Sequence, residues 1–260
     1  KKTNFNQLFG DPYPNKEKLL TATFEDGVQV TFPEQRQKNY QIIMMRTIPK
    51  TIAQFWNPSS VGEEKPDWVI HNTAVLKYHH PDFDLKVFTY TEALEFIRKN
   101  FDCHVFAAFR KCAIPAMQSD FFRCCYLYIA GGFYFDLKTV CHRPFLYEYI
   151  DIQEDMVIMT RNHELLLNRF IGAHPSAEGL RLAISEMVDN ILNEKFKELF
   201  VTTGAPILTK QCQKAYGSKY EKVKTLFYGE NCPIDFCGLN YKSEHWSIAE
   251  KKQSIYSNID

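Results

Sequence analysis

The sequence predicts an α/β protein in which helices cover both faces of a mostly parallel sheet. Short segments rich in β-branched and aromatic residues alternate along the chain with segments of helical periodicity. The expected strands cover 51–56, 85–89, 133–136, 156–160 and 222–228. The expected helices cover 91–100, 104–113, 117–130, 176–197 and 206–216. The chain has 260 residues, of which 45% are hydrophobic, so it can form one large buried core.

Local signals mark the ends of several of these elements. The pair Asn57-Pro58 ends the first expected strand. The glycine pair at 131–132 ends the helix over 117–130, because glycine adopts the left-handed conformation at little cost. In the next strand, alternation places Phe133 and Phe135 on one face and Tyr134 and Asp136 on the other.

The first part of the chain has a different texture. Residues 1–46 are polar and are interrupted by glycine and proline, so we expect an extension with one short hairpin around Gly27. Residues 47–260 form the expected folded domain. The eight cysteines are interpreted as reduced, buried thiols, with disulfides as the alternative that the even count permits. Cys232 and Cys237 lack the companions that a zinc site needs.

Charge and hydropathy exclude several classes of function. Lysine plus arginine equals aspartate plus glutamate at 31 each, and without a basic stripe a nucleic-acid partner is not expected. No run of about 18 apolar residues and no signal-peptide core is present, so membrane association is not evident. We expect a cytoplasmic protein, and a position at the inner face of the membrane is compatible with this expectation. The first residue is not Met, so the Golgi lumen is the alternative if an anchor has been removed.

Three charged residues are the candidates for a ligand site. Asp136 follows a hydrophobic strand, and ligands of open α/β sheets bind beyond the carboxyl ends of strands. Asp120 and Arg123 are three positions apart on the preceding helix and therefore share a face. An arginine can bind phosphate or sugar oxygens, and a carboxylate accepts bonds from sugar hydroxyls. The alternative is a surface ion pair together with an aspartate in a turn.

The segments SDFFR at 119–123, LY at 127–128 and GGFYFD at 131–136 resemble the core signature of glycosyltransferase family 32. This family contains a DXD motif and includes initiating α-mannosyltransferases, and its core is similar to that of the large clostridial glucosylating toxins. Further blocks resemble the family in order, with Ala53 where a histidine is common. They are IPKTIAQFW at 48–56, NRFIGA at 168–173, TGAP at 203–206 and HW at 245–246.

The resemblance implies a GT-A-type, Rossmann-like fold and a nucleotide-sugar donor, and it assigns roles by position. Trp56 would stack on the base, Asp120 would bond donor-sugar hydroxyls, and Arg123 would contact the sugar or diphosphate. Asp136, the first DXD carboxylate, would bind the ribose or the sugar. For Trp56, a place in the core is the alternative.

The resemblance also assigns three later residues. Asn168 would approach the donor sugar near the reaction centre, with a capping role as the alternative. His245 and Trp246 would lie on a loop that closes over the diphosphate, or else belong to a packed tail.

One position departs from the family pattern. Lys138 stands where the second acid of the DXD motif is expected, and that acid supports Mn²⁺ or Mg²⁺ in the family. The first interpretation is a metal-independent enzyme in which Lys138 contacts the diphosphate. The second keeps the metal, with Asp136 and His245 as ligands. The third is a catalytically weakened protein that binds nucleotide sugars or glycans.

The function that the resemblance implies is retaining transfer of a hexose or HexNAc to a glycan or glycolipid acceptor. The abundance of Lys, Asn, Phe and Tyr, together with the lack of glycosylation sites, indicates surface-polysaccharide synthesis. A UDP-sugar is the preferred donor and GDP-mannose the second. A Rossmann dehydrogenase is disfavoured because no Gly-X-Gly-X-X-Gly follows a strand. A cysteine hydrolase based on Cys141 and His142 is disfavoured because neighbours in sequence rarely form a catalytic pair.

Overall fold

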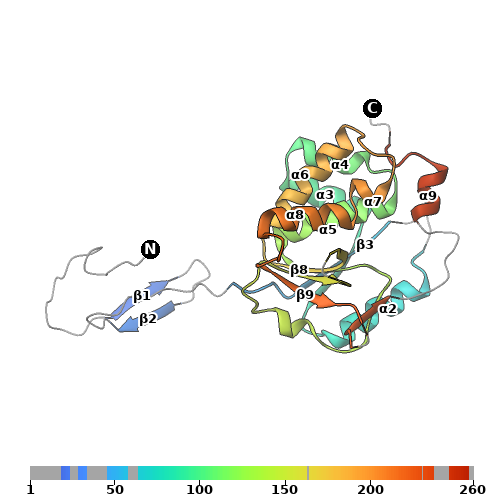
Figure 1. The fold of residues 1–260 in the computed structure, drawn as a ribbon. Coiled ribbons are helices and arrows are strands. Elements are labelled where there is room, and N and C mark those ends of the chain that lie inside the picture. The colour runs from blue at the N-terminus through green and yellow to red at the C-terminus, as the bar shows by residue number, and fades with distance from the viewer. Residues whose placement is uncertain are drawn as a thin grey trace, which may run out of the picture. The chain divides into compact units, whose positions relative to one another are not determined.

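The computed structural model describes residues 19–23, 29–33, 46–57, 64–162, 164–229, 231–236 and 246–257. The chain divides into two compact units, 1–45 and 46–260. In the first unit, β1 (Leu19–Thr23) pairs antiparallel with β2 (Gln29–Pro33), on either side of the predicted turn (Figure 1). Gly27 itself lies outside the described residues. Arg46 forms an ion pair with Asp155 at 2.9 Å within the second unit.

The second unit contains a six-stranded sheet of order β4-β3-β5-β8-β7-β9. Its strands are β3 (Thr51–Trp56), β4 (Asp84–Thr89), β5 (Gly132–Phe135), β7 (Met156–Thr160), β8 (Leu166–Ala173) and β9 (Val223–Phe227). β3 is parallel to both β4 and β5, and β7 is parallel to β9. Only β8 runs against its neighbours, β5 and β7. The predicted mostly parallel sheet is therefore confirmed, with one reversed strand in its middle.

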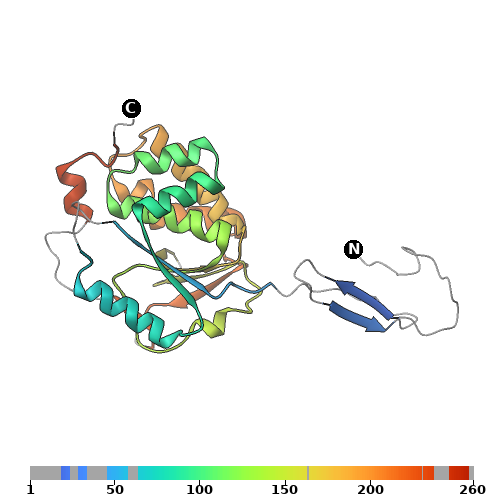
Figure 2. The ribbon, with the colours of Figure 1, turned by 180° about the vertical axis from the view of Figure 1, so that it is seen from behind.

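Helices cover the two faces of this sheet unequally (Figures 1 and 2). One face carries α3 (Tyr90–Asn100), α4 (Cys103–Lys111), α5 (Pro115–Ala130), α6 (Glu178–Leu192), α7 (Leu199–Thr202) and α8 (Ala205–Tyr216). The other face carries α2 (Asp67–His79), the 3₁₀ turn η1 (Leu146–Tyr149) and an antiparallel ribbon of β6 (Thr139–Cys141) and β10 (Ile234–Phe236). The last helix is α9 (Trp246–Lys252). Among the described residues, no helix has the length and apolarity that crossing a bilayer requires.

Strand β5 separates the two hydrophobic clusters of the core. Tyr134 belongs to the cluster under α3–α8, and Phe133 and Phe135 belong to the cluster under α2. The predicted alternation along this strand is thus confirmed. The glycine pair before it is required by sterics, since Gly131 and Gly132 have φ of +66° and +88°. A Cβ on Gly132 would lie 2.1 Å from Oγ1 of Thr51.

Three parts of the predicted pattern are wrong. The expected strands do not include β8, which lies over Leu166–Ala173. The expected helices also do not include α2, which lies over Asp67–His79. Its apolar residues do not form a single stripe, because Ile70 and Tyr78 are exposed. The helix predicted over 176–197 ends at Leu192. Glu194 then adopts a positive φ of 47°, and α7 follows as a separate short helix.

Candidate functional site

Chain geometry brings Asp136 back beside the middle of α5. Seven residues of helix from Arg123 to Ala130 span about 10 Å, and the four residues of β5 return about 13 Å. The Nη2 atom of Arg123 therefore lies 2.9 Å from Oδ1 of Asp136 and 3.0 Å from Oδ1 of Asp120. The side chain of Arg123 is 3% exposed and that of Asp120 is 11% exposed. The alternative of a surface ion pair is therefore wrong.

The other donors of Arg123 are also engaged. Nε donates to the carbonyl of Ser119 at 3.1 Å, and Nη2 donates to the Ser119 hydroxyl at 2.8 Å. Nη1 donates to the carbonyl of Asn168 at 2.5 Å. The guanidinium carbon lies 4.6 Å from the ring centroid of Tyr134, whose hydroxyl contacts the Ser119 hydroxyl at 2.7 Å. Arg123 is thus fixed in one orientation by α5, β5 and β8 together.

The reversed strand β8 supplies Asn168. Its amide Nδ2 donates to Oδ1 of Asp120 at 2.9 Å. Residues 48 positions apart in the sequence therefore share one buried polar cluster, which consists of Ser119, Asp120, Arg123, Asp136 and Asn168. We call this set the Arg123 cluster.

Burial raises the pKa of both carboxyl groups in this cluster. Burial raises the pKa of Asp120 to about 7, although Arg123 acts to lower it. Burial also raises the pKa of Asp136, while the positive charges of Arg123, Arg169 and Lys138 oppose this rise. The side chain of Asp136 is 30% exposed, so of the two carboxylates it is the one that faces solvent more.

Trp56 ends β3 and is half-buried, at the carboxyl edge where Asp136 follows β5. The next residue, Asn57, donates from Nδ2 to Oε1 of Gln118 at 2.7 Å. Gln118 lies two residues before Asp120 on α5 and donates from Nε2 to the carbonyl of Cys112 at 2.8 Å. The end of β3 is therefore tied to the helix that carries the Arg123 cluster.

Helix α2 contributes polar contacts that sequence reasoning missed. Asn72, which is buried, donates from Nδ2 to the carbonyl of Leu137 at 3.0 Å. Leu137 is the middle residue of the tripeptide at 136–138, so this bond fixes that loop. Thr73 donates to Oε1 of the buried Gln54 on β3 at 2.9 Å. The sequence gives little indication of these contacts, because Asn72-Thr73 is an isolated polar pair and matches no motif.

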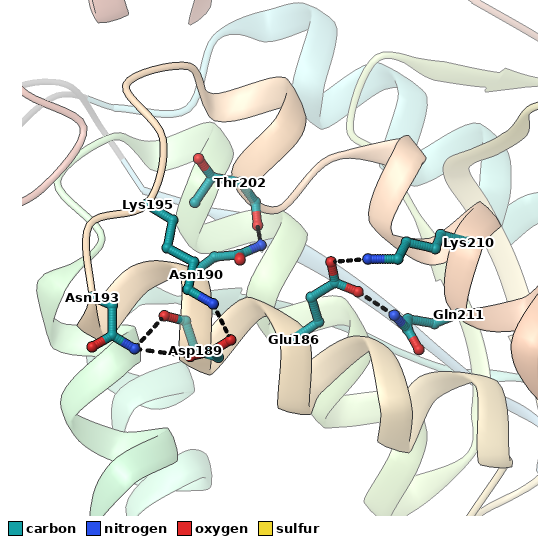
Figure 3. Close-up of polar contacts among 8 residues, drawn as sticks. All are labelled: Glu186, Asp189, Asn190, Asn193, Lys195, Thr202, Lys210 and Gln211. Carbon is teal, nitrogen blue, oxygen red and sulfur yellow. Dashed lines mark hydrogen bonds and ion pairs between the residues drawn. The ribbon is translucent and has the colours of Figure 1, made fainter.

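The residues on either side of the block at 203–206 are bonded to α6, as Figure 3 shows. Asn190 on α6 donates to the carbonyl of Thr202 at 3.3 Å, and Glu186 accepts from Lys210 at 2.7 Å and from Gln211. Thr203 is fully buried, and its hydroxyl is close enough to Asp120 to act to lower the pKa of that carboxyl group, although it forms no hydrogen bond with the described residues. The predicted block therefore lies beside the Arg123 cluster.

The residues at 136–138 do not fit a divalent metal. Such an ion takes several oxygen ligands, whereas Asp136 is bonded to Arg123 and its expected companion is Lys138. Over the part of the chain that the structure describes, no group of three or more His, Cys, Asp or Glu side chains is arranged to hold a metal ion. The predicted ligand His245 and the side chain of Trp246 lie outside the described residues.

Two surface hollows are lined by other residues. The first lies where β9 ends, is formed by residues that include Arg143, Tyr149 and Phe227, and has a volume of about 280 Å³. The second lies near Asp155 and Tyr216, where β7 and β9 begin. Neither hollow is lined by a predicted site residue. The Arg123 cluster is therefore identified as the candidate site by its buried charged side chains and by its position at the carboxyl edge of the sheet.

Comparisons with known proteins bear on this arrangement. Residues 66–163 match a family described as "Glycosyltransferase sugar-binding region containing DXD motif". The chain is similar in structure to the PaToxG glycosyltransferase, with a TM-score of 0.54 and 16% identity over 65% of this chain and 69% of that chain. The catalytic domain of alpha-toxin from Clostridium novyi matches with a TM-score of 0.42 and 10% identity, over 66% and 65% of the two chains. No curated protein sequence matches the chain.

The family match spans α2 to β7 and contains Asp120, Arg123 and Asp136, and the similar solved structure supports the same fold. Residues 66–163 are therefore similar to a DXD-type glycosyltransferase region, and the chain has a GT-A-like fold.

Proposed function

We propose that this nucleotide-sugar-dependent glycosyltransferase moves a hexose or HexNAc from a UDP-sugar to a glycan or glycolipid acceptor in surface-polysaccharide synthesis. GDP-mannose is the second donor to test. The observation that supports this proposal is the Arg123 cluster, in which two carboxylates and one amide gather at the carboxyl edge of a mostly parallel sheet. Residues 47–260 form the proposed catalytic domain, with 1–46 as an extension.

The proposed roles follow from which atoms remain available. Asp120 and Asn168 receive the donor sugar, because a carboxylate and an amide together accept from and donate to sugar hydroxyls. Asp136, the more exposed carboxylate, receives the ribose or the sugar. Arg123 directs its donors at protein groups, so its role is to position Asp120 and Asp136 rather than to bind the diphosphate. Trp56, at the end of β3, stacks on the base.

The proposed reaction retains the configuration of the donor. Both carboxylates of the cluster are held by Arg123, so neither is offered as a free nucleophile toward the sugar. The bond from the anomeric carbon to the diphosphate breaks, and the acceptor oxygen forms its bond on the same face. The acceptor proton passes to the leaving diphosphate. The protein supplies orientation of the two substrates and stabilisation of charge.

A donor panel tests the proposal. UDP- and GDP-sugars are compared by thermal shift and by donor hydrolysis, and the product of the active donor is analysed by NMR. We expect stabilisation and turnover with one UDP-sugar and an α-linked product from an α-linked donor. A β-linked product would contradict retention. Binding of nucleotide sugars without any turnover would favour a nucleotide-sugar-binding protein instead.

A further inference from the structure

The side chains at 136–138 differ from the DXD motif of the matching family. A DXD pair holds a divalent cation through carboxylate oxygens, and the cation neutralises the leaving diphosphate. Here Arg123 occupies Oδ1 of Asp136 at 2.9 Å, and the second acid is replaced by Lys138. A protonated lysine cannot ligate a cation, but it carries a positive charge of its own.

A second cation lies next to Asp136 on the adjacent strand. The backbone nitrogen of Asp136 donates to the carbonyl of Arg169 at 2.8 Å, so Arg169 is its direct neighbour on β8. Lys138 follows in a turn in which the nitrogen of Thr139 donates to the carbonyl of Asp136 at 2.9 Å. Lys138 and Arg169 are both partly exposed. Both charges reach Asp136, since both act to lower the pKa of its carboxyl group.

The guanidinium of Arg169 lies over an aromatic ring. Its Cζ lies 5.9 Å from the ring centroid of Tyr228, and Cζ of Arg161 lies 5.4 Å from the same ring. The Tyr228 hydroxyl donates to Asp235 at 2.7 Å, which fixes the ring. Arg169 and Arg161 thus place two positive charges on one ring at this edge of the sheet, with Asp235 as the acid bonded to Tyr228.

We infer that Lys138 and Arg169 hold the donor diphosphate and supply the positive charge that a divalent cation supplies in proteins with an intact DXD motif. This inference rests on the proposed function and identifies the residues by which the site binds the diphosphate of its donor. Lys138 acts as a point charge, and Arg169 forms paired hydrogen bonds to phosphate oxygens. Diphosphate binding by this chain therefore requires no metal ion.

Calorimetry with UDP and with GDP tests the inference. We expect the better nucleotide to bind the wild-type protein with the same Kd in excess EDTA and in Mn²⁺. Lys138→Met and Arg169→Met should each weaken that binding by about tenfold or more in EDTA, because each removes a charge-assisted contact. Arg98→Met is the matched control, since Arg98 is an exposed cation whose partner is Glu95 on α3. It should leave the Kd unchanged.

The outcomes separate this inference from the proposed function. Binding of UDP only when Mn²⁺ is present would overturn the inference and leave the proposed function standing. Equal binding by both variants and the wild type would also overturn it. No binding of either nucleotide under any condition would overturn the proposed function itself.

A gain-of-function variant provides a readout that does not depend on turnover. Lys138→Asp restores the second acid of the motif, and we expect the variant to bind Mn²⁺ in the presence of UDP, as measured by electron paramagnetic resonance. Its unfolding midpoint should remain close to that of the wild type, because Lys138 is partly exposed. Mn²⁺ binding by the wild-type protein at the same occupancy would overturn the inference.

Discussion

Three ion pairs with identical spacing have different surroundings in this molecule. Asp120 and Arg123 on α5, Glu178 and Arg181 on α6, and Glu95 and Arg98 on α3 are all i,i+3 pairs. The side chains of the last two pairs are between 46% and 63% exposed, whereas those of the first pair are nearly buried. Spacing therefore identifies a contact, and burial decides whether the contact organises a site.

Removal of the cation from each pair should show the difference between buried and exposed pairs most clearly. Arg123→Ala leaves Asp120 and Asp136 without their partner, and loss of one member of a buried pair destabilises a protein by about 3–5 kcal/mol. Arg98→Ala should have a far smaller effect because water already solvates Glu95. Urea denaturation followed by circular dichroism measures both. Equal losses for the two variants would show that burial is not what distinguishes the pairs.

The second prediction separates function from stability within the Arg123 cluster. Asp136→Asn keeps the size of the side chain and removes its charge, so we expect turnover to fall by roughly 10²-fold or more. The fold should be retained because Asp136 is the more exposed carboxylate of the cluster. Steady-state kinetics with the active donor measures the loss, and Glu178→Gln on α6 is the matched control. Unchanged turnover in Asp136→Asn would remove this residue from the site.

The third prediction uses pH. Burial raises the pKa of Asp120 to about 7, so the folded protein binds a proton that the unfolded chain, with a pKa of about 3.9, has released. Between these values the contribution of Asp120 to stability therefore falls as pH rises, with a limiting slope of about 1.4 kcal/mol per pH unit. Below the lower value and above the higher one, the contribution of Asp120 to stability should no longer change with pH.

Urea denaturation between pH 4 and pH 8 measures this effect as the difference between the wild type and Asp120→Asn. The wild type should lose stability relative to the variant as pH rises through this range. A difference that stays constant with pH would mean that Asp120 is ionised throughout.

The sequence predicts those parts of the molecule that depend on local spacing. The helix before the glycine pair, the alternation in β5 and the carboxyl end at Asp136 all follow from patterns within a short stretch of chain. The resemblance then joins these positions into one site. Asn168 could be named from its family block, but no local pattern places its amide against Asp120.

Long-range pairing explains what the sequence did not predict. Arg169 neighbours Asp136 only because β8 runs antiparallel between β5 and β7, which reverses one strand in an otherwise parallel order. The bond from Asn72 to Leu137 joins a helix without an apolar stripe to a loop 65 positions away. Neither contact leaves a periodic signal, because each arises from packing between separate elements.

The smallest expected effect concerns the partly buried contacts between α6 and α8 in Figure 3. Glu186 accepts from Lys210 and from the buried Gln211, so this carboxylate is intermediate between the Arg123 cluster and the exposed pairs. Glu186→Gln keeps the shape and removes the charge, and we expect a loss of about 1 kcal/mol or less, measured by urea denaturation. A loss as large as that of Arg123→Ala would mean that the α6–α8 contacts, rather than the buried cluster, hold this half of the fold together.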